Sequence, residues 1–88
     1  MNKVALITGS KGGIGSAISS QLVNDGYRVI ATYNTGNYEC ALEWFNSKGF
    51  TKDQVRLLEL DVTDTAQCAE TLALLLQEEG TLDVVVNN

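Results

Sequence analysis

The feature that most constrains the fold is a regular alternation of short apolar runs with stretches of helical periodicity. Four runs are rich in β-branched residues or leucine and are short enough for strands: residues 4–8, 29–33, 55–60 and 82–87. Between them, apolar residues recur at helical spacing over residues 14–24, over about 38–47, and from Asp64 to Gly80. This order predicts parallel strands joined by right-handed helical crossovers.

The helices can be given predicted boundaries and inward faces. The third helix is the clearest, because Asp64 can cap its start with Gln67 three residues later, and Gly80 can end it. The predicted inward faces are Ile14, Ala17, Ile18 and Leu22 in the first helix, Ala41, Leu42 and Phe45 in the second, and Ala69, Leu72, Ala73 and Leu76 in the third.

These elements predict an α/β fold with a Rossmann-type parallel sheet, half of a doubly wound three-layer sandwich of strand order 3-2-1-4. Residues 4–7 are apolar on both faces, as a central strand requires, whereas Arg56 and Glu59 suit an edge strand. The fourth run contains three consecutive valines, which is central-strand sequence, yet no fifth strand follows. We therefore expect residues 1–88 to be the N-terminal portion of a larger domain. The alternative is a complete small domain that covers this strand by dimerising.

Charge and composition argue against several classes of partner. Eleven acidic against six basic residues give a net charge of -5 without a Lys/Arg cluster, so neither nucleic acid nor a polybasic membrane contact is expected. The apolar stretch near the start is too short for a signal sequence or a membrane span, so we expect a cytoplasmic protein. With no histidine and two distant cysteines, Cys40 and Cys68, no metal site is expected. Both cysteines are expected to pack, reduced, as small apolar residues.

The segment ITGSKGGIG, residues 7–15, joins the first strand to the first helix. Gly9 permits the turn out of the strand, Gly13 lets the main chain approach a pyrophosphate, and Gly15 lets the helix pack against the sheet. The helix N-terminus adds N–H groups and a positive dipole end, so the segment predicts phosphate binding. It is not a Walker A loop, because Gly15 is followed directly by Ser16, and its glycine spacing also differs from G-x-G-x-x-G.

This spacing resembles the cofactor loop of the short-chain dehydrogenase/reductase family in its single-domain form. Two further features match: Asp61-Val62 after the third strand, where the family sets a carboxylate and an amide against adenine, and Asn87-Asn88, which resembles the start of the Asn-Asn-Ala-Gly signature. The resemblance covers all 88 residues and implies an NAD(P)-binding Rossmann domain whose catalytic C-terminal portion is absent. Taken alone, Asp61 could instead cap the turn before Thr63-Asp64, and the two asparagines could be ordinary loop residues after a strand.

The end of the second strand bears on the choice of cofactor. NAD-binding folds usually place an acidic side chain there to bind the ribose 2'-hydroxyl, but this sequence has Tyr33 followed by Asn34. Since no carboxylate repels a 2'-phosphate, NADPH is expected and NADH is less favoured. Lys11 either supplies a positive charge to that phosphate or is a solvated loop lysine. The predicted cofactor-binding residues are Gly9, Ser10, Lys11, Gly13, Ile14, Gly15, Tyr33, Asn34, Asp61, Val62, Asn87 and Asn88.

Within the family, residues 9–34 and 40–50 are most similar to the acetoacetyl-CoA reductases of polyhydroxybutyrate synthesis and next to 3-oxoacyl-ACP reductases. The resemblance implies reduction of a 3-oxoacyl thioester, carried on CoA or ACP, by a homo-oligomer that is a tetramer when complete. It places the catalytic Ser, Tyr and Lys beyond Asn88, so no catalytic residue is assigned here. Tyr27, Tyr33 and Tyr38 lack a lysine four positions later. The alternative function is a nucleotide-binding module without reductase activity.

Overall fold

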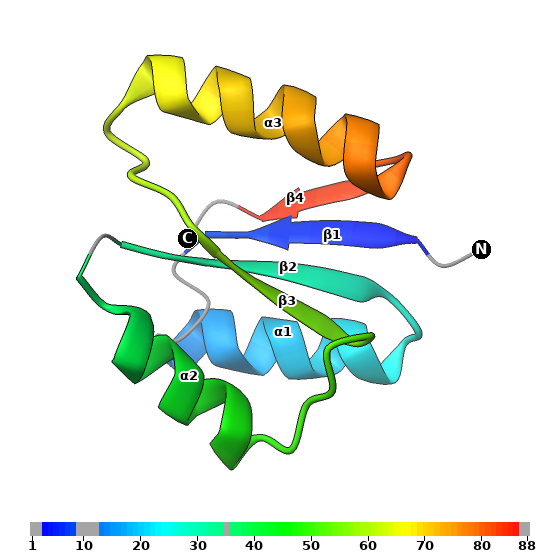
Figure 1. The fold of residues 1–88 in the computed structure, drawn as a ribbon. Helices are drawn as coiled ribbons and strands as arrows, with labels where there is room; N and C mark the ends of the chain where they lie inside the picture. Colours follow the sequence, from blue (N-terminus) through cyan, green and yellow to red (C-terminus); the bar gives the residue numbers. More distant parts are fainter. Residues whose placement is uncertain (1–2, 9–12, 35, 87–88) are drawn as a thin grey trace.

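The computed structural model describes residues 3–8, 13–34 and 36–86. The elements follow the predicted order: β1 (Val4–Ile7), α1 (Gly13–Asn24), β2 (Arg28–Tyr33), α2 (Tyr38–Ser47), β3 (Val55–Glu59), α3 (Thr65–Glu79) and β4 (Val84–Val86). All paired strands are parallel, and the sheet has the order β3-β2-β1-β4, which confirms the predicted topology. Helices α1 and α2 cover one face of the sheet and α3 covers the other (Figure 1).

The position of each strand in the sheet agrees with its sequence. Every residue of β1 is buried, as is the middle of β2, and these are the two inner strands. After Val55 the outer strand β3 has three partly buried residues and then the exposed Glu59, so neither Arg56 nor Glu59 needs to be desolvated fully. Strand β4 occupies the other outer position of the described sheet, and its central Val85 is 58% exposed.

The core divides into two clusters, one on each face of the sheet. On the α1 and α2 face, four buried strand residues meet side chains from both helices and from the loops that flank them; the buried residues are Ile7, Val29, Ala31 and Val55. On the α3 face, Val4, Leu6 and Ile30 meet Leu75 of the helix. Strands that alternate their side chains between two apolar faces explain why β1 is entirely apolar and why the buried middle of β2 contains only one polar residue, Thr32.

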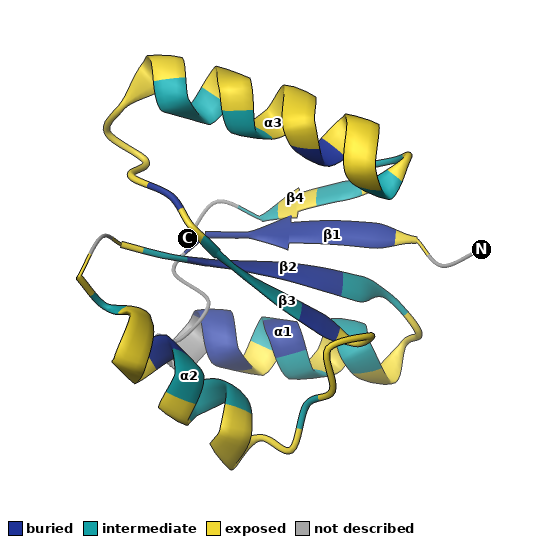
Figure 2. Cartoon of the chain, in the orientation of Figure 1, coloured by how far each residue is buried: buried dark blue, intermediate teal, exposed yellow. Residues whose placement is uncertain are grey.

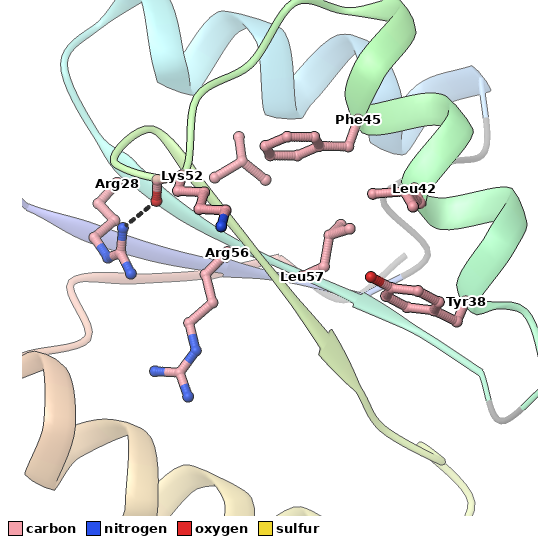
Figure 3. Close-up of a pocket in the computed structure, with 8 residues that line it drawn as sticks. Arg28, Tyr38, Leu42, Phe45, Lys52, Arg56 and Leu57 are labelled. Atoms are coloured by element: carbon pink, nitrogen blue, oxygen red, sulfur yellow. Dashed lines mark hydrogen bonds between the residues drawn. The ribbon is translucent and has the colours of Figure 1, made fainter.

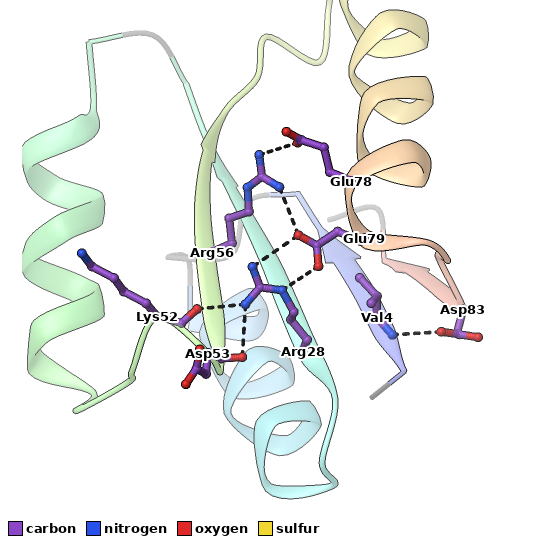
Figure 4. Close-up of polar contacts among 8 residues, drawn as sticks. All are labelled: Val4, Arg28, Lys52, Asp53, Arg56, Glu78, Glu79 and Asp83. Atoms are coloured by element: carbon purple, nitrogen blue, oxygen red, sulfur yellow. Dashed lines mark hydrogen bonds and ion pairs between the residues drawn. The ribbon is translucent and has the colours of Figure 1, made fainter. Parts of the chain in front are cut away.

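Polar contacts reinforce the α3 face at the amino ends of the strands (Figure 4). The Glu79 carboxylate accepts hydrogen bonds from Arg28 Nε at 2.6 Å and from Arg56 Nη1 at 3.0 Å, so it links β2 and β3 to the last turn of α3. Glu78 Oε1 accepts from Arg56 Nη2 at 2.8 Å. Nearby, the Val4 N–H donates to Asp83 Oδ2 at 2.9 Å, which fastens the start of β1 to the segment that enters β4.

The predicted ends of α3 are confirmed, but its predicted inward face is wrong. Asp64 Oδ1 accepts from the Gln67 N–H at 3.0 Å, and Gly80 adopts a left-handed conformation with φ 84°. Leu75 is the buried residue of this helix, whereas all four residues of the predicted face are exposed: Ala69, Leu72, Ala73 and Leu76. The sequence of α3 is apolar on more than one side, so its periodicity did not identify the side that meets the sheet.

The other two helices bear out most of the predicted packing. In α2, Ala41 is buried and Leu42 and Phe45 are partly buried, as expected. In α1, Ala17 is exposed, contrary to prediction, and Ser19 is buried in its place. The Ser19 hydroxyl is satisfied by donating to the Gly15 carbonyl at 2.9 Å, which is why a polar side chain is tolerated there.

The remaining expectations concern the cysteines, membrane-spanning helices and metal sites. Both cysteines are free, but Cys40 is exposed and Cys68 only partly buried, so the expectation that both pack in the core is wrong. Among the described residues, no helix is long and apolar enough to cross a bilayer. The same part of the chain contains no group of three or more His, Cys, Asp or Glu side chains that could hold a metal ion.

Candidate functional site

The candidate site lies at the edge of the sheet where the parallel strands end. Because all pairings are parallel, the carboxyl ends of the strands gather at this edge, and α1 begins there at Gly13. The Thr8 N–H donates to the Val86 carbonyl at 3.1 Å, so the chain leaves β1 directly beside the end of β4. Ligands of open α/β sheets bind at this edge, outside the carboxyl ends of the strands.

A hollow of about 310 Å³ at this edge is lined by residues that follow β2 and β3: Asn34, Asp61, Val62 and Thr63. The two strands are paired, and the Leu60 N–H donates to the Tyr33 carbonyl at 2.9 Å, so their ends stay in register up to the hollow. Three residues predicted from the sequence as cofactor-binding, Asn34, Asp61 and Val62, are thus brought together.

Hydrogen bonds to both its side chain and its backbone fix Asp61 within this hollow. Its Oδ1 accepts from the Thr63 hydroxyl at 2.6 Å and from the Thr63 N–H at 2.9 Å, and these bonds lower the pKa of the exposed carboxyl. Its backbone N–H donates to Gln67 Oε1 at 2.8 Å. The carboxylate is therefore ionised and oriented, with capacity left to accept a hydrogen bond from a ligand.

Thr63 and Gln67 support the site, although neither was among the residues predicted from the sequence. The signal for Thr63 was the Asp-x-Thr pattern, in which the carboxylate of the first residue bonds two residues ahead. Gln67 was expected to act within the cap of α3, and its backbone does so, but its side chain reaches back to Asp61 instead. The two supports tie the hollow to the first turn of α3.

Tyr33 stands at the end of β2, beside the hollow but not among the residues that line it. Its ring lies 5.8 Å from the ring of Tyr38, centroid to centroid, and the two planes are tilted by 54°. Burial raises the pKa of the Tyr33 phenol, and the nearby Glu59 carboxylate raises it further. Tyr33 is therefore neutral at physiological pH, so neither it nor Asn34 contributes a negative charge at the end of β2.

The start of α1 supplies the second part of the site. Gly13 and Ile14 open the helix, and Gly15 is buried within its first turn. A helix start offers N–H groups without intrahelical partners, together with the positive end of the helix dipole, both suited to an anion. The other predicted site residues lie outside the described residues: Gly9, Ser10, Lys11, Asn87 and Asn88.

A larger hollow, of about 350 Å³, lies elsewhere, along β3 under α2 (Figure 3). Its lining combines apolar and cationic side chains: Arg28, Tyr38, Leu42, Phe45, Lys52, Val55, Arg56 and Leu57. Arg28 and Arg56 are already paired with Glu79, so they offer little free charge. The smaller hollow is the better candidate, because it alone of the two lies at the carboxyl ends of the strands.

Comparison with known proteins agrees with the fold. The model of the short chain dehydrogenase family matches residues 3–88, and the chain belongs to this family. It is 40% identical over 86 residues to the acetoacetyl-CoA reductase of Acinetobacter sp. (strain RA3849), a match that covers 98% of this chain and 35% of the relative. It is 35% identical over 89 residues to the 7alpha-hydroxysteroid dehydrogenase of Bacteroides fragilis, covering 99% of this chain and 33% of the relative.

A solved structure, ElxO with NADP bound, has the same fold over this region. The TM-score is 0.84 at 31% sequence identity, and the match covers 100% of this chain and 35% of ElxO. The chain therefore spans about a third of the length of the relatives that it matches. The parallel sheet of order β3-β2-β1-β4 agrees with membership of the short chain dehydrogenase family.

Proposed function

We propose that this chain is the cofactor-binding portion of an NADPH-dependent oxidoreductase that reduces the keto group of a 3-oxoacyl thioester such as acetoacetyl-CoA. The observation that carries the proposal is the hollow of Asn34, Asp61 and Val62, which lies at the same edge of the sheet as the start of α1. Both lie at the carboxyl ends of the strands, where the diphosphate and adenosine of a dinucleotide would need neighbouring sites. Membership of the short chain dehydrogenase family supports it.

The described residues fit two parts of such a cofactor, its diphosphate and its adenine. The diphosphate would be held at the start of α1, where Gly13 and Gly15 stand, and adenine against Asp61 and Val62. The Asp61 carboxylate is ionised and held by Thr63, so it is prepared to accept a hydrogen bond from an exocyclic amine. When bound, NADPH supplies the hydride for reduction.

The choice of NADPH rests on the neutral end of β2. A carboxylate at this position would bind the ribose 2'-hydroxyl of NADH and repel a 2'-phosphate, but Tyr33 and Asn34 are both uncharged. The NADP-bound state of ElxO is consistent with this choice. Lys11 is proposed as the cation for the 2'-phosphate.

The proposed substrate follows the relative named acetoacetyl-CoA reductase, with a 3-oxoacyl-ACP as the second candidate carrier. The hydroxysteroid dehydrogenase matches almost as well, so residues 1–88 support the reaction class more strongly than the substrate. We propose that the catalytic Ser, Tyr and Lys lie outside these residues, in a complete enzyme that is a cytoplasmic homo-oligomer, a tetramer. In that case the 88-residue chain binds NADPH but does not oxidise it when acetoacetyl-CoA is added; turnover would contradict this assignment.

The test of the cofactor assignment is calorimetric titration of the chain and of Asn34→Asp with NADPH and with NADH. The wild-type chain is expected to bind NADPH more tightly. The new carboxylate is expected to weaken NADPH binding about 10-fold or more, because a like charge near the 2'-phosphate costs at least about 1.4 kcal/mol. NADH binding should be unchanged or stronger.

Asn34→Ser is the matched control, since it changes the same side chain without adding charge. It should leave the ratio of NADPH to NADH affinity within about 2-fold of wild type. If Asn34→Asp and Asn34→Ser behave alike, the 2'-phosphate does not lie at the end of β2. If the wild-type chain binds neither dinucleotide, the proposed function itself is wrong.

A further inference from the structure

We propose that Trp44 is a positioning residue for dinucleotide binding, because it holds the first turn of α1 in place from the neighbouring helix α2. The proposal rests on the function proposed above, and it concerns a residue that does not line the candidate site. Its basis is one hydrogen bond: Trp44 Nε1 donates to Ser16 Oγ at 2.9 Å. Among the hydrogen bonds between described residues, this one alone joins α1 to α2.

Ser16 stands where a displacement would affect phosphate binding. It is the fourth residue of α1, directly after Gly15, and it is only 8% exposed. The first four N–H groups of a helix lack intrahelical partners, and they are the donors that a diphosphate would use. The hydroxyl of Ser16 therefore faces inward to Trp44, while its backbone belongs to the turn that offers N–H groups to the ligand.

Trp44 is itself held rigidly, so it can act as a fixed point. Its ring meets the ring of Phe50 edge-on, with centroids 5.4 Å apart, and it packs against the buried cluster on this face of the sheet. An indole offers one donor and no acceptor, so the direction of its single hydrogen bond is fixed by the orientation of the ring. A well-packed donor of this kind locates its acceptor more closely than packing alone does.

A second contact in the same turn adds to the effect. The Ser19 hydroxyl donates to the Gly15 carbonyl at 2.9 Å, and Ser19 is fully buried. Two side-chain hydrogen bonds thus hold the first turn of α1, one from Ser19 within the same helix and one from Trp44 of α2. Preorganised donors bind an anion better because no free energy is spent on ordering them when the ligand arrives.

The test compares Trp44→Phe with Phe45→Leu in the 88-residue chain. Trp44→Phe keeps an aromatic ring against Phe50 but removes the N–H donor together with part of the indole surface, so NADPH binding is expected to weaken about 3- to 10-fold. Phe45→Leu removes apolar contact from the same helix without touching Ser16, so it should lower stability and leave NADPH affinity unchanged. Calorimetry at a temperature where each variant is folded separates affinity from stability.

Ser16→Ala removes the acceptor but keeps the backbone N–H. Ser16→Ala alone and combined with Trp44→Phe should weaken NADPH binding to the same degree as Trp44→Phe alone, because all three variants lack the same bond. Additive losses, or a Trp44→Phe affinity equal to wild type, would overturn the positioning role while leaving the cofactor assignment intact.

Amide hydrogen exchange of the unliganded chain makes the inference testable even if NADPH does not bind. Exchange over the first two turns of α1 should be faster in Trp44→Phe than in wild type and unchanged in Phe45→Leu. Equal exchange in the two variants would show that Trp44 does not hold this turn. Failure of the wild-type chain to bind NADPH would count against the proposed function instead.

Discussion

The two faces of the sheet are covered in different ways. On one face, α1 and α2 contribute several partly buried apolar side chains, including Leu22, Trp44 and Phe45, to the cluster around the strands. On the other face, α3 lies alone and Leu75 is its buried residue, while much of the helix surface is exposed (Figure 2). Apolar contact thus holds α1 and α2, whereas α3 depends on one leucine and on ion pairs at its end.

This difference bears on the candidate site. The start of α1, which would hold the diphosphate, belongs to the well-packed face, and α2 supports it through Trp44 and Ser16. The hollow at the end of β3 depends on α3, because Gln67 of that helix fixes the Asp61 backbone. The part of the site proposed to hold adenosine should therefore be more sensitive to changes that loosen α3 than the part proposed to hold the diphosphate.

The largest loss of stability is expected from Leu75→Ala, which removes the buried side chain of α3. Leu75 is fully buried against Val4, Leu6 and Ile30, so truncation should lower the free energy of unfolding by about 2–5 kcal/mol. Leu74→Ala is the control, because Leu74 is 48% exposed, and it should cost less than about 1 kcal/mol. Denaturant unfolding measures both; equal losses would show that Leu75 does not carry the packing of α3.

A smaller effect is expected from Glu79→Gln, which removes the charge shared by Arg28 and Arg56. The Glu79 side chain is only 11% exposed and bonds both arginines, so the loss should be about 1–2 kcal/mol. Glu78→Gln is the control: its side chain is 43% exposed and it pairs with Arg56 alone, so about 0.5 kcal/mol or less is expected. A larger loss from Glu78→Gln than from Glu79→Gln would contradict the assigned roles.

The ion pairs of Glu79 with Arg28 and Arg56 predict that stability depends on pH. The hydrogen bond from Arg28 lowers the pKa of Glu79 below its ordinary value of 4.5, against the opposing effect of burial. A lowered folded-state pKa stabilises the fold fully above pH 4.5, and this stabilisation is lost as the pH falls through the folded-state pKa. The difference in unfolding free energy between wild type and Glu79→Gln should therefore shrink below pH 4.5 and be constant above it. If the difference in unfolding free energy stayed the same below pH 4.5, the ion pairs would not be its source.

The smallest effect is expected from Leu76→Gln on the outer side of α3. Leu76 is 50% exposed, and leucine and glutamine have similar helix propensities, so stability should change by no more than about 0.5 kcal/mol. Thermal unfolding of the variant beside wild type is sufficient to measure this. A loss above about 1 kcal/mol would mean that this side of α3 is covered in solution, and the contrast between the two faces would then disappear.

The site was predicted from the sequence only as far as local patterns reach. Asn34 was identified from its place after the second strand, and Asp61 and Val62 from the resemblance to a known family; the paired ends of β2 and β3 do bring them together. Gln67 was not identified, because its bond to Asp61 spans a turn whose path the sequence does not specify. The bond between Trp44 and Ser16 joins residues 28 positions apart, and no periodicity in either helix indicates it.

Local sequence determined the order of strands and helices along the chain and the ends of α3 at Asp64 and Gly80, and together with the Rossmann pattern it predicted the strand order of the sheet. These depend on periodicity, capping and chain connection, which act within a few residues or follow general rules of handedness. Only the tertiary structure decided that Leu75 rather than Leu72 meets the sheet, and that Glu79 joins two strands. When a helix is apolar on several sides, the side that faces the sheet is the one that packs best and lets the charged residues pair. That choice depends on residues distant in the sequence.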